Sequence, residues 1–88
     1  MLTFFDSVAS YDSSRLIVLF TGQDGDKAVQ CAISREALED YFGLDHQHPL
    51  KVFNANREKI EHEARRKYLA NQLEKEGLVL VRTEDFEA

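Results

Sequence analysis

The chain has 88 residues, of which 43% are hydrophobic and 31% are charged, and its formal net charge is -5 at pH 7. This length supports one domain over residues 1–88, with a thin core and little room for a deep pocket. The negative charge argues against nucleic acid as the main partner, and the longest apolar run, Leu16–Phe20, is too short to cross a membrane.

The N-terminal segment has neither the basic nor the long apolar region of a secretory signal, so we expect no such signal. Two runs rich in β-forming residues, 15–21 and 27–33, flank the turn signal Asp24-Gly25. Together they predict a β-hairpin with a loop of about five residues. An earlier strand near 3–5 or 8–11 is a weaker prediction.

Ser34 predicts the start of a short helix, because its hydroxyl can cap the free amides of the first turn. Ile33 and Leu38 stand where a hydrophobic staple forms across such a start. Gly43 suits the left-handed position that ends a helix, and Leu44 can then fold back onto Leu38. The exposed side of this helix carries carboxylates that we interpret as aids to solubility, namely Glu36, Glu39 and Asp40.

Pro49 is well placed as the first residue of a second helix, which we predict to run without interruption over residues 49–72. One sector of this helix, about 80° wide, is mainly apolar. The sector contains Leu50, Phe53, Ile60, Ala64 and Tyr68, together with Arg57 and Asn71. Gly77 then breaks the chain, and residues 78–83 predict a final strand.

This order of elements predicts an α+β fold with a small, largely antiparallel sheet and helices packed on the sheet. The runs LIVLF at 16–20 and LVLV at 78–81 are apolar at every position, which indicates that both faces of the sheet are buried. If both helices share one face, either Ile17 and Leu19 or their alternates stay uncovered. A large uncovered apolar surface marks a contact site, so we predict a homodimer or another protein partner there.

Cys31 is the only cysteine, so the chain can form no internal disulfide, and a reduced, cytoplasmic setting is expected. It alternates with Val29 and Ile33, which favours a small buried residue over a reactive thiol. His46 and His48 are of metal-binding type, but the sequence offers few further ligands to complete a site. We predict no catalytic, cofactor-binding or metal-ligating residue.

Arg57 stands out because it falls in the apolar sector of the predicted long helix. Arginine seldom faces a core without a partner. Its stem can pack on the edge of the sheet with the guanidinium at the rim. Alternatively, its forked donors can clamp an anion or a carboxylate.

The stretch EARRKY at 63–68 places Arg65, Arg66 and Lys67 in a row, which raises the question of a phosphate-binding surface. On a helix, neighbouring side chains point ~100° apart, so the three cations cannot form one patch. Glu61 precedes Arg65 by four positions and Glu63 precedes Lys67 by four, the favourable order for helical ion pairs. We therefore predict a charge-balanced helix end, with Arg66 and His62 left to meet a partner.

Two stretches, CAISREALEDYFG at 31–43 and NREKIEHEARRKY at 56–68, with a last strand that ends near Asp85-Phe86, resemble a known family. It is a small family of uncharacterised bacterial proteins, a domain of unknown function found largely in proteobacteria. The resemblance covers about residues 1–86, and the Cys-Ala-Ile-Ser-x-Glu-Ala-Leu stretch is fairly specific. It implies a compact α+β domain in the bacterial cytoplasm and carries over no catalytic or binding residue.

Three functions follow from these observations. The favoured one is a small non-enzymatic protein-binding or regulatory module that self-associates, with Arg57, His62 and Arg66 as partner or anion contacts. The first alternative is nucleic-acid or transcription-linked binding through the long helix. The second is an enzyme that uses Cys31 or the loop of His46 and His48. No cofactor is expected for the favoured function.

Overall fold

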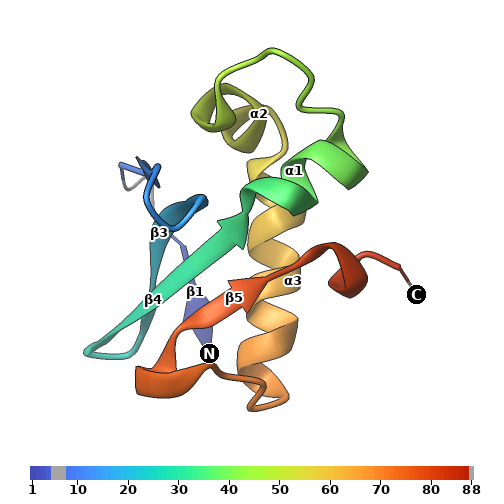
Figure 1. Cartoon of the computed structure of the whole chain (residues 1–88). Helices are drawn as coiled ribbons and strands as arrows, with labels where there is room; N and C mark the ends of the chain where they lie inside the picture. Colours follow the sequence, from blue (N-terminus) through green and yellow to red (C-terminus); the bar gives the residue numbers. More distant parts are fainter. Residues whose placement is uncertain (5–7, 88) are drawn as a thin grey trace.

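A computed structural model describes residues 1–4 and 8–87 of the chain, which form one sheet of five strands with three helices packed against it (Figure 1). This arrangement confirms the predicted α+β fold. In chain order the elements are β1 (Leu2–Thr3), β2 (Ser10–Asp12), β3 (Ile17–Asp24), β4 (Lys27–Ser34), α1 (Arg35–Phe42), α2 (Pro49–Ala55), α3 (Arg57–Leu69), the 3-10 turn η1 (Lys75–Gly77), β5 (Val79–Val81) and the 3-10 turn η2 (Thr83–Asp85).

The sheet has the strand order β1-β3-β4-β5, and β2 pairs with the other end of β3. β1, β2 and β4 all run antiparallel to β3, so the prediction of a largely antiparallel sheet is confirmed. β5 alone is parallel to its neighbour, with Cys31 of β4 opposite Val79. The three helices form the long connection that a parallel pair requires.

The β3–β4 hairpin is tighter than predicted. Asp24 pairs with Lys27, so the turn has two residues where we expected a loop of about five. Gly25 has a φ of 61°, the left-handed conformation that two-residue hairpin turns need and that glycine adopts without cost. The weaker expectation of an early strand is met by β1 and β2, although Phe5 lies outside the described residues.

Helix α1 follows its local signals. The hydroxyl of Ser34 accepts a hydrogen bond from the amide of Ala37 at 3.1 Å. Gly43 has a φ of 65°, and the amide of Leu44 donates to the carbonyl of Leu38 at 3.1 Å. Both ends of the helix therefore form as the sequence predicts.

The prediction that the second helix runs without interruption is wrong, because the helix is divided at Asn56 into α2 and α3. Asn56 has φ -122° and ψ 19°, outside the helical range. Its side-chain amide donates to the carbonyl of Val52 at 2.9 Å, so it competes with the backbone for the hydrogen bonds of the helix. The break lets α2 pack on β2 and β3, while α3 packs on β1 and β5. α3 also ends at Leu69, three residues before the predicted end.

The core lies between the helices and one face of the sheet. Its strand residues alternate with those of the other face and include Val18, Phe20, Cys31, Ile33, Val79 and Val81. The last strand is shorter than the predicted 78–83, because Thr83 begins η2. The chain then returns towards α1, where the ring of Phe86 stacks on that of Tyr41 with their centres 4.7 Å apart.

Candidate interaction surface

The face of the sheet opposite the helices is apolar at its centre. Leu19 of β3 lies opposite Ala32 of β4, and Ala32 lies opposite Leu80 of β5, so one apolar row crosses three strands. Ile17 precedes this row on β3. No helix of the described chain lies on this face, as the view in Figure 1 shows, with α3 behind the sheet. We call it the open face, and it carries Ile17 and Leu19, one of the two sets of residues predicted to stay uncovered if the helices share one face.

The open face is not a flat, wholly exposed patch. Ile17 and Ala32 are 7% and 0% exposed, while Leu19 and Leu80 are half-buried by their neighbours. Two open cavities of about 490 and 350 Å³ lie on this face. Ile17 and Leu80 line the larger cavity, and Leu19 lines the smaller one. Apolar side chains therefore stand at the base of recesses that a partner can fill.

Two strained residues border these cavities. Leu16 has a φ of 57° and lines the larger cavity, where its side chain is 52% exposed. Glu76 has a φ of 67° and lines the smaller one. A left-handed backbone is unfavourable for such side chains, and strain of this kind gathers at functional sites. The amide of Arg35 fixes Leu16 in place by donating to its carbonyl at 2.8 Å.

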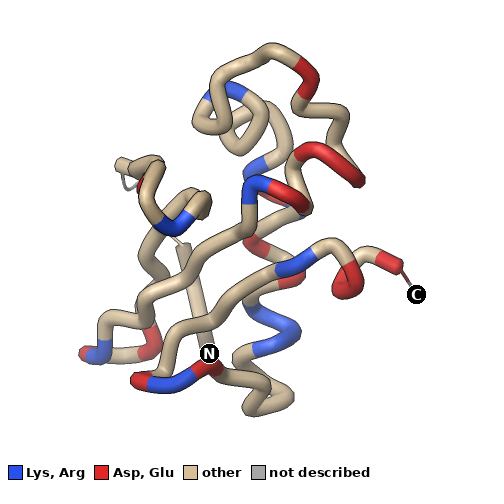
Figure 2. The backbone as a smooth tube through the Cα atoms, viewed as in Figure 1, with Lys and Arg blue, Asp and Glu red and all other residues tan. Residues whose placement is uncertain are grey.

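Charged residues of both signs surround the larger cavity. Arg15 and Arg35 lie on its walls, and Glu36, Glu39 and Asp40 of α1 line it as well. Basic and acidic positions are also interspersed along the rest of the described backbone, where no broad region has a single sign (Figure 2). The arrangement suits a partner that carries both signs better than it suits a polyanion.

Of the four charged residues of α1, three oppose the dipole of the helix, while Glu36 in the first turn follows it. Arg35 is its first residue, at the end where an anion is favoured, and Glu39 and Asp40 lie in its last turn. From the sequence alone, these carboxylates are interpreted as aids to solubility, and no role is predicted for Arg35. A visible signal was a cation directly after the N-cap and two carboxylates shortly before the closing glycine.

Arg57 lies at the start of α3 with its side chain largely withdrawn from solvent. Its Nε donates to Oε2 of Glu61 at 2.7 Å, and its guanidinium lies over the ring of Phe53, 5.2 Å from the centre. The guanidinium thus packs on an aromatic ring and also holds a carboxylate of the same chain. Its predicted role as a partner contact stays a prediction.

The EARRKY cations are paired differently from the prediction. Arg66 has no carboxylate four positions before it, but it donates to Glu63, three positions before it, at 2.6 Å, so the prediction that it is left unpaired within the helix is wrong. The Nε of Arg65 donates to the carbonyl of Leu2 at 2.7 Å and holds β1. Lys67 is nearly buried and forms an ion pair with Asp85. Within the described residues, all three cations thus have partners inside the chain, and Arg66 as a partner contact stays a prediction.

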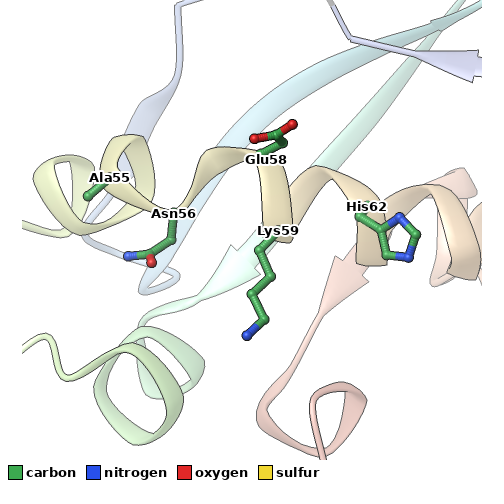
Figure 3. A pocket seen from close by; sticks show the side chains of 5 residues that line it. All are labelled: Ala55, Asn56, Glu58, Lys59 and His62. Atoms are coloured by element: carbon green, nitrogen blue, oxygen red, sulfur yellow. The ribbon is translucent and has the colours of Figure 1, made fainter.

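His62 lines an open pocket of about 510 Å³ on the helical side of the molecule, with Asn56, Glu58 and Lys59 (Figure 3). Figure 3 shows Glu58 pointing to the opposite side from Lys59. Lys59 is therefore not directed at Glu58, and its ammonium lies 4.8 Å from the centre of the Tyr41 ring of α1. Neither Arg57 nor Arg66 lines this pocket, so the structure does not bring the three predicted contacts together.

Cys31 is buried, as predicted, and burial raises the pKa of its thiol to about 12. His46 is exposed in its loop, while Nδ1 of His48 caps α2 by accepting from the amide of Leu50 at 3.1 Å. No cluster of three or more His, Cys, Asp or Glu side chains suited to a metal ion occurs among residues 1–4 and 8–87. In the same part of the chain, every helix is too short or too polar to span a bilayer.

Comparisons with known proteins concern the chain as a whole. The family described as protein of unknown function (DUF1488) matches residues 2–81. The crystal structure of a protein of unknown function from this family, from Shewanella loihica PV-4, has a TM-score of 0.82 and 20% sequence identity. The match covers 91% of this chain and 90% of that one, and shows that the two share a fold. None of the curated proteins matches the chain. The chain therefore belongs to the DUF1488 family of proteins of unknown function.

Proposed function

We propose that this chain is a small non-enzymatic binding module that self-associates through the open face of its sheet. The observation that carries the proposal is the apolar row of Leu19, Ala32 and Leu80, which crosses three strands on the side without helices. A water-facing sheet surface is ordinarily polar. A second copy is favoured as the partner because the rim carries charges of both signs, which can meet their opposites across a two-fold axis.

The size of the molecule is compatible with this proposal. Stable interfaces bury roughly 800 Å² on each partner. A molecule that measures 37 × 28 × 24 Å has a broad side large enough to supply such an area. The larger cavity also makes the apolar surface concave, so a side chain from the partner can enter it.

The alternatives have less support. Nucleic-acid binding through α3 would need free cations, but Arg65 and Lys67 are engaged with Leu2 and Asp85. Thiol chemistry would need a lowered pKa, whereas burial raises the pKa of Cys31. A single free cysteine also fits the reduced, cytoplasmic setting that we propose for the protein.

Sedimentation equilibrium of the wild type and of a Leu16→Asp variant tests the proposal. Leu16 is exposed at the rim of the open face, and aspartate tolerates its left-handed backbone. We expect a wild-type dimer at tens of micromolar and a monomeric Leu16→Asp variant, since a buried apolar contact would become a buried charge.

Leu69→Asp is the matched control. Leu69 is 64% exposed and lies at the end of α3, on the other side of the sheet. This variant should dimerise like the wild type. A wild type that stays monomeric at about 100 µM, a concentration at which weak interfaces still populate, would refute the proposal. So would equal effects of the two substitutions on the dissociation constant.

A further inference from the structure

We infer that two copies meet with their α1 helices side by side and antiparallel, so that Arg35 of each copy pairs with Glu39 of the other. This inference rests on the proposed self-association through the open face and specifies its geometry. Both residues line the larger cavity of that face together with Ile17 and Leu80. A partner seated on the apolar row therefore also reaches α1.

Three charged residues are placed against the dipole of α1: Arg35 stands at its positive end, and Glu39 and Asp40 stand near its negative end. Glu36 in the first turn follows the dipole. The three opposed placements are locally unfavourable, and such conflicts between local rules and sequence are expected where a residue serves a purpose outside its own element. An antiparallel neighbour of the same sequence supplies charges of the favourable sign at both ends of the helix. It brings carboxylates to the N-terminal end of the helix and a cation to the C-terminal end.

The side chain of Arg35 forms no ion pair or hydrogen bond in the described structure, and neither does that of Glu39. The two stand four positions apart but with the cation first, which is the weaker order for a helical pair. Asp40 differs, because it accepts a hydrogen bond from Thr83 at 3.4 Å.

Arg35 is an exception among the arginines that the structure describes. The others bond within the chain: Arg15 to Asp12, Arg57 to Glu61, Arg65 to the carbonyl of Leu2, Arg66 to Glu63 and Arg82 to Glu74. Arginine is enriched at protein interfaces, where its forked donors hold carboxylates of the partner. The position of Arg35 on the rim of an apolar recess is the place for such a contact.

The two-fold symmetry of a dimer makes the expected contact reciprocal. In a two-fold dimer, a contact between residue 35 of one copy and residue 39 of the other occurs twice. The expected pair is therefore reciprocal, and its two halves can be separated by charge reversal. Arg35→Glu alone places two carboxylates side by side at both contacts, and Glu39→Arg alone places two guanidinium groups there. Both homodimers are destabilised by like charges.

The experiment measures dimer dissociation constants for Arg35→Glu, for Glu39→Arg, for the double variant and for an equimolar mixture of the two single variants. We expect each single variant to dissociate about tenfold or more readily than the wild type. The double variant should dimerise nearly as well as the wild type. The mixture should form a heterodimer, detected by native mass spectrometry, because both of its contacts then join opposite charges.

Lys51→Glu and Glu58→Arg are the control reversals, since both residues are exposed on the helical side. They should leave the dissociation constant within about twofold of the wild type. Circular dichroism and thermal unfolding verify that every variant is folded. Single reversals that do not weaken a wild-type dimer, or a mixture that stays unpaired, would overturn the antiparallel arrangement alone. A wild type that never dimerises would overturn the proposed function as well.

Discussion

Lys67 of α3 and Asp85 of η2 form an ion pair of 2.8 Å from which solvent is nearly excluded, with side chains 8% and 12% exposed. The ammonium of Lys67 also donates to the carbonyl of Leu80 at 2.7 Å. Asp85 accepts a second bond at 2.7 Å from the amide of Arg82. The pair therefore joins the end of α3 to the last strand and to the segment that follows it.

The first prediction concerns removal of one member of this pair. Asp85→Ala leaves a buried ammonium without its carboxylate and should lower the free energy of unfolding by about 3 kcal/mol. Lys67→Met should cost less, because the methionine fills the same space without a charge. Urea unfolding measures both. Glu74→Ala, which removes the exposed pair with Arg82, is the control and should cost less than about 1 kcal/mol. Equal losses for Asp85→Ala and Glu74→Ala would contradict the prediction.

The second prediction concerns the stability of the protein at low pH. The hydroxyl of Tyr68 donates to Asp24 at 2.6 Å, and together with the N-terminal ammonium it lowers the pKa of Asp24. A lowered pKa in the folded state contributes stability that is present above the ordinary value and is lost as the pH falls through the folded value.

Tyr68→Phe should therefore be less stable than the wild type at pH 7, and the difference should shrink once the pH falls below ~4, the ordinary range of an aspartate. Urea unfolding at pH 7, 5 and 3 measures this difference. Asp24→Asn should remove most of the pH dependence of the difference. A gap between Tyr68→Phe and wild type that stays constant from pH 7 to pH 3 would be inconsistent with the bond.

The third prediction concerns the packing of β1 on β3. A Cβ added at Gly22 would lie 2.8 Å from Cδ1 of Leu2 and 3.0 Å from the ring of Phe4. Leu2 is fully buried, so it has little space to retreat. Gly22→Ala should cost about 1–3 kcal/mol, the range for an overfilled core. Thr21→Ala, at the neighbouring position on the open face, is the control. A melting temperature for Gly22→Ala equal to that of Thr21→Ala would show that β1 is not packed as described.

The fourth prediction concerns Cys31. Because burial raises the pKa of its thiol to about 12, very little of the thiol is ionised at pH 8. A disulfide reagent such as DTNB should modify the native protein no faster than the protein unfolds, and should modify it at once in urea. Complete modification within a few minutes under native conditions, without loss of secondary structure, would contradict the buried environment.

The sequence predicts well those features that depend on neighbouring residues. The ends of α1 are examples, since Ser34 bonds to Ala37 and Gly43 adopts its left-handed conformation without help from distant parts of the chain. The sequence also indicates which face of the sheet is covered. Apolar residues alternate with small or polar ones along β4, and this alternation places Cys31 and its apolar neighbours on the covered side.

Features that depend on tertiary contacts were less predictable. The difference in helix propensity between asparagine and a good helix former is less than ~1 kcal/mol, so the sequence alone cannot decide that the helix breaks at Asn56. The charges of EARRKY illustrate the same limit. A helical pair contributes about 0.2–0.5 kcal/mol, which a nearly buried partner outweighs, and Lys67 accordingly binds Asp85, 18 positions away.

The parallel pairing of β4 with β5 has a consequence for the synthesis of the protein. Val79 pairs with Cys31, and the two residues are separated by 48 peptide bonds along the chain (79 minus 31). Contacts so distant in sequence form late and slow folding. On the ribosome, the strand that completes the sheet and the aspartate that binds Lys67 both emerge after the other strands and all three helices. The nascent chain therefore exposes its core face until β5 has emerged, and chaperones can bind to that face during the interval.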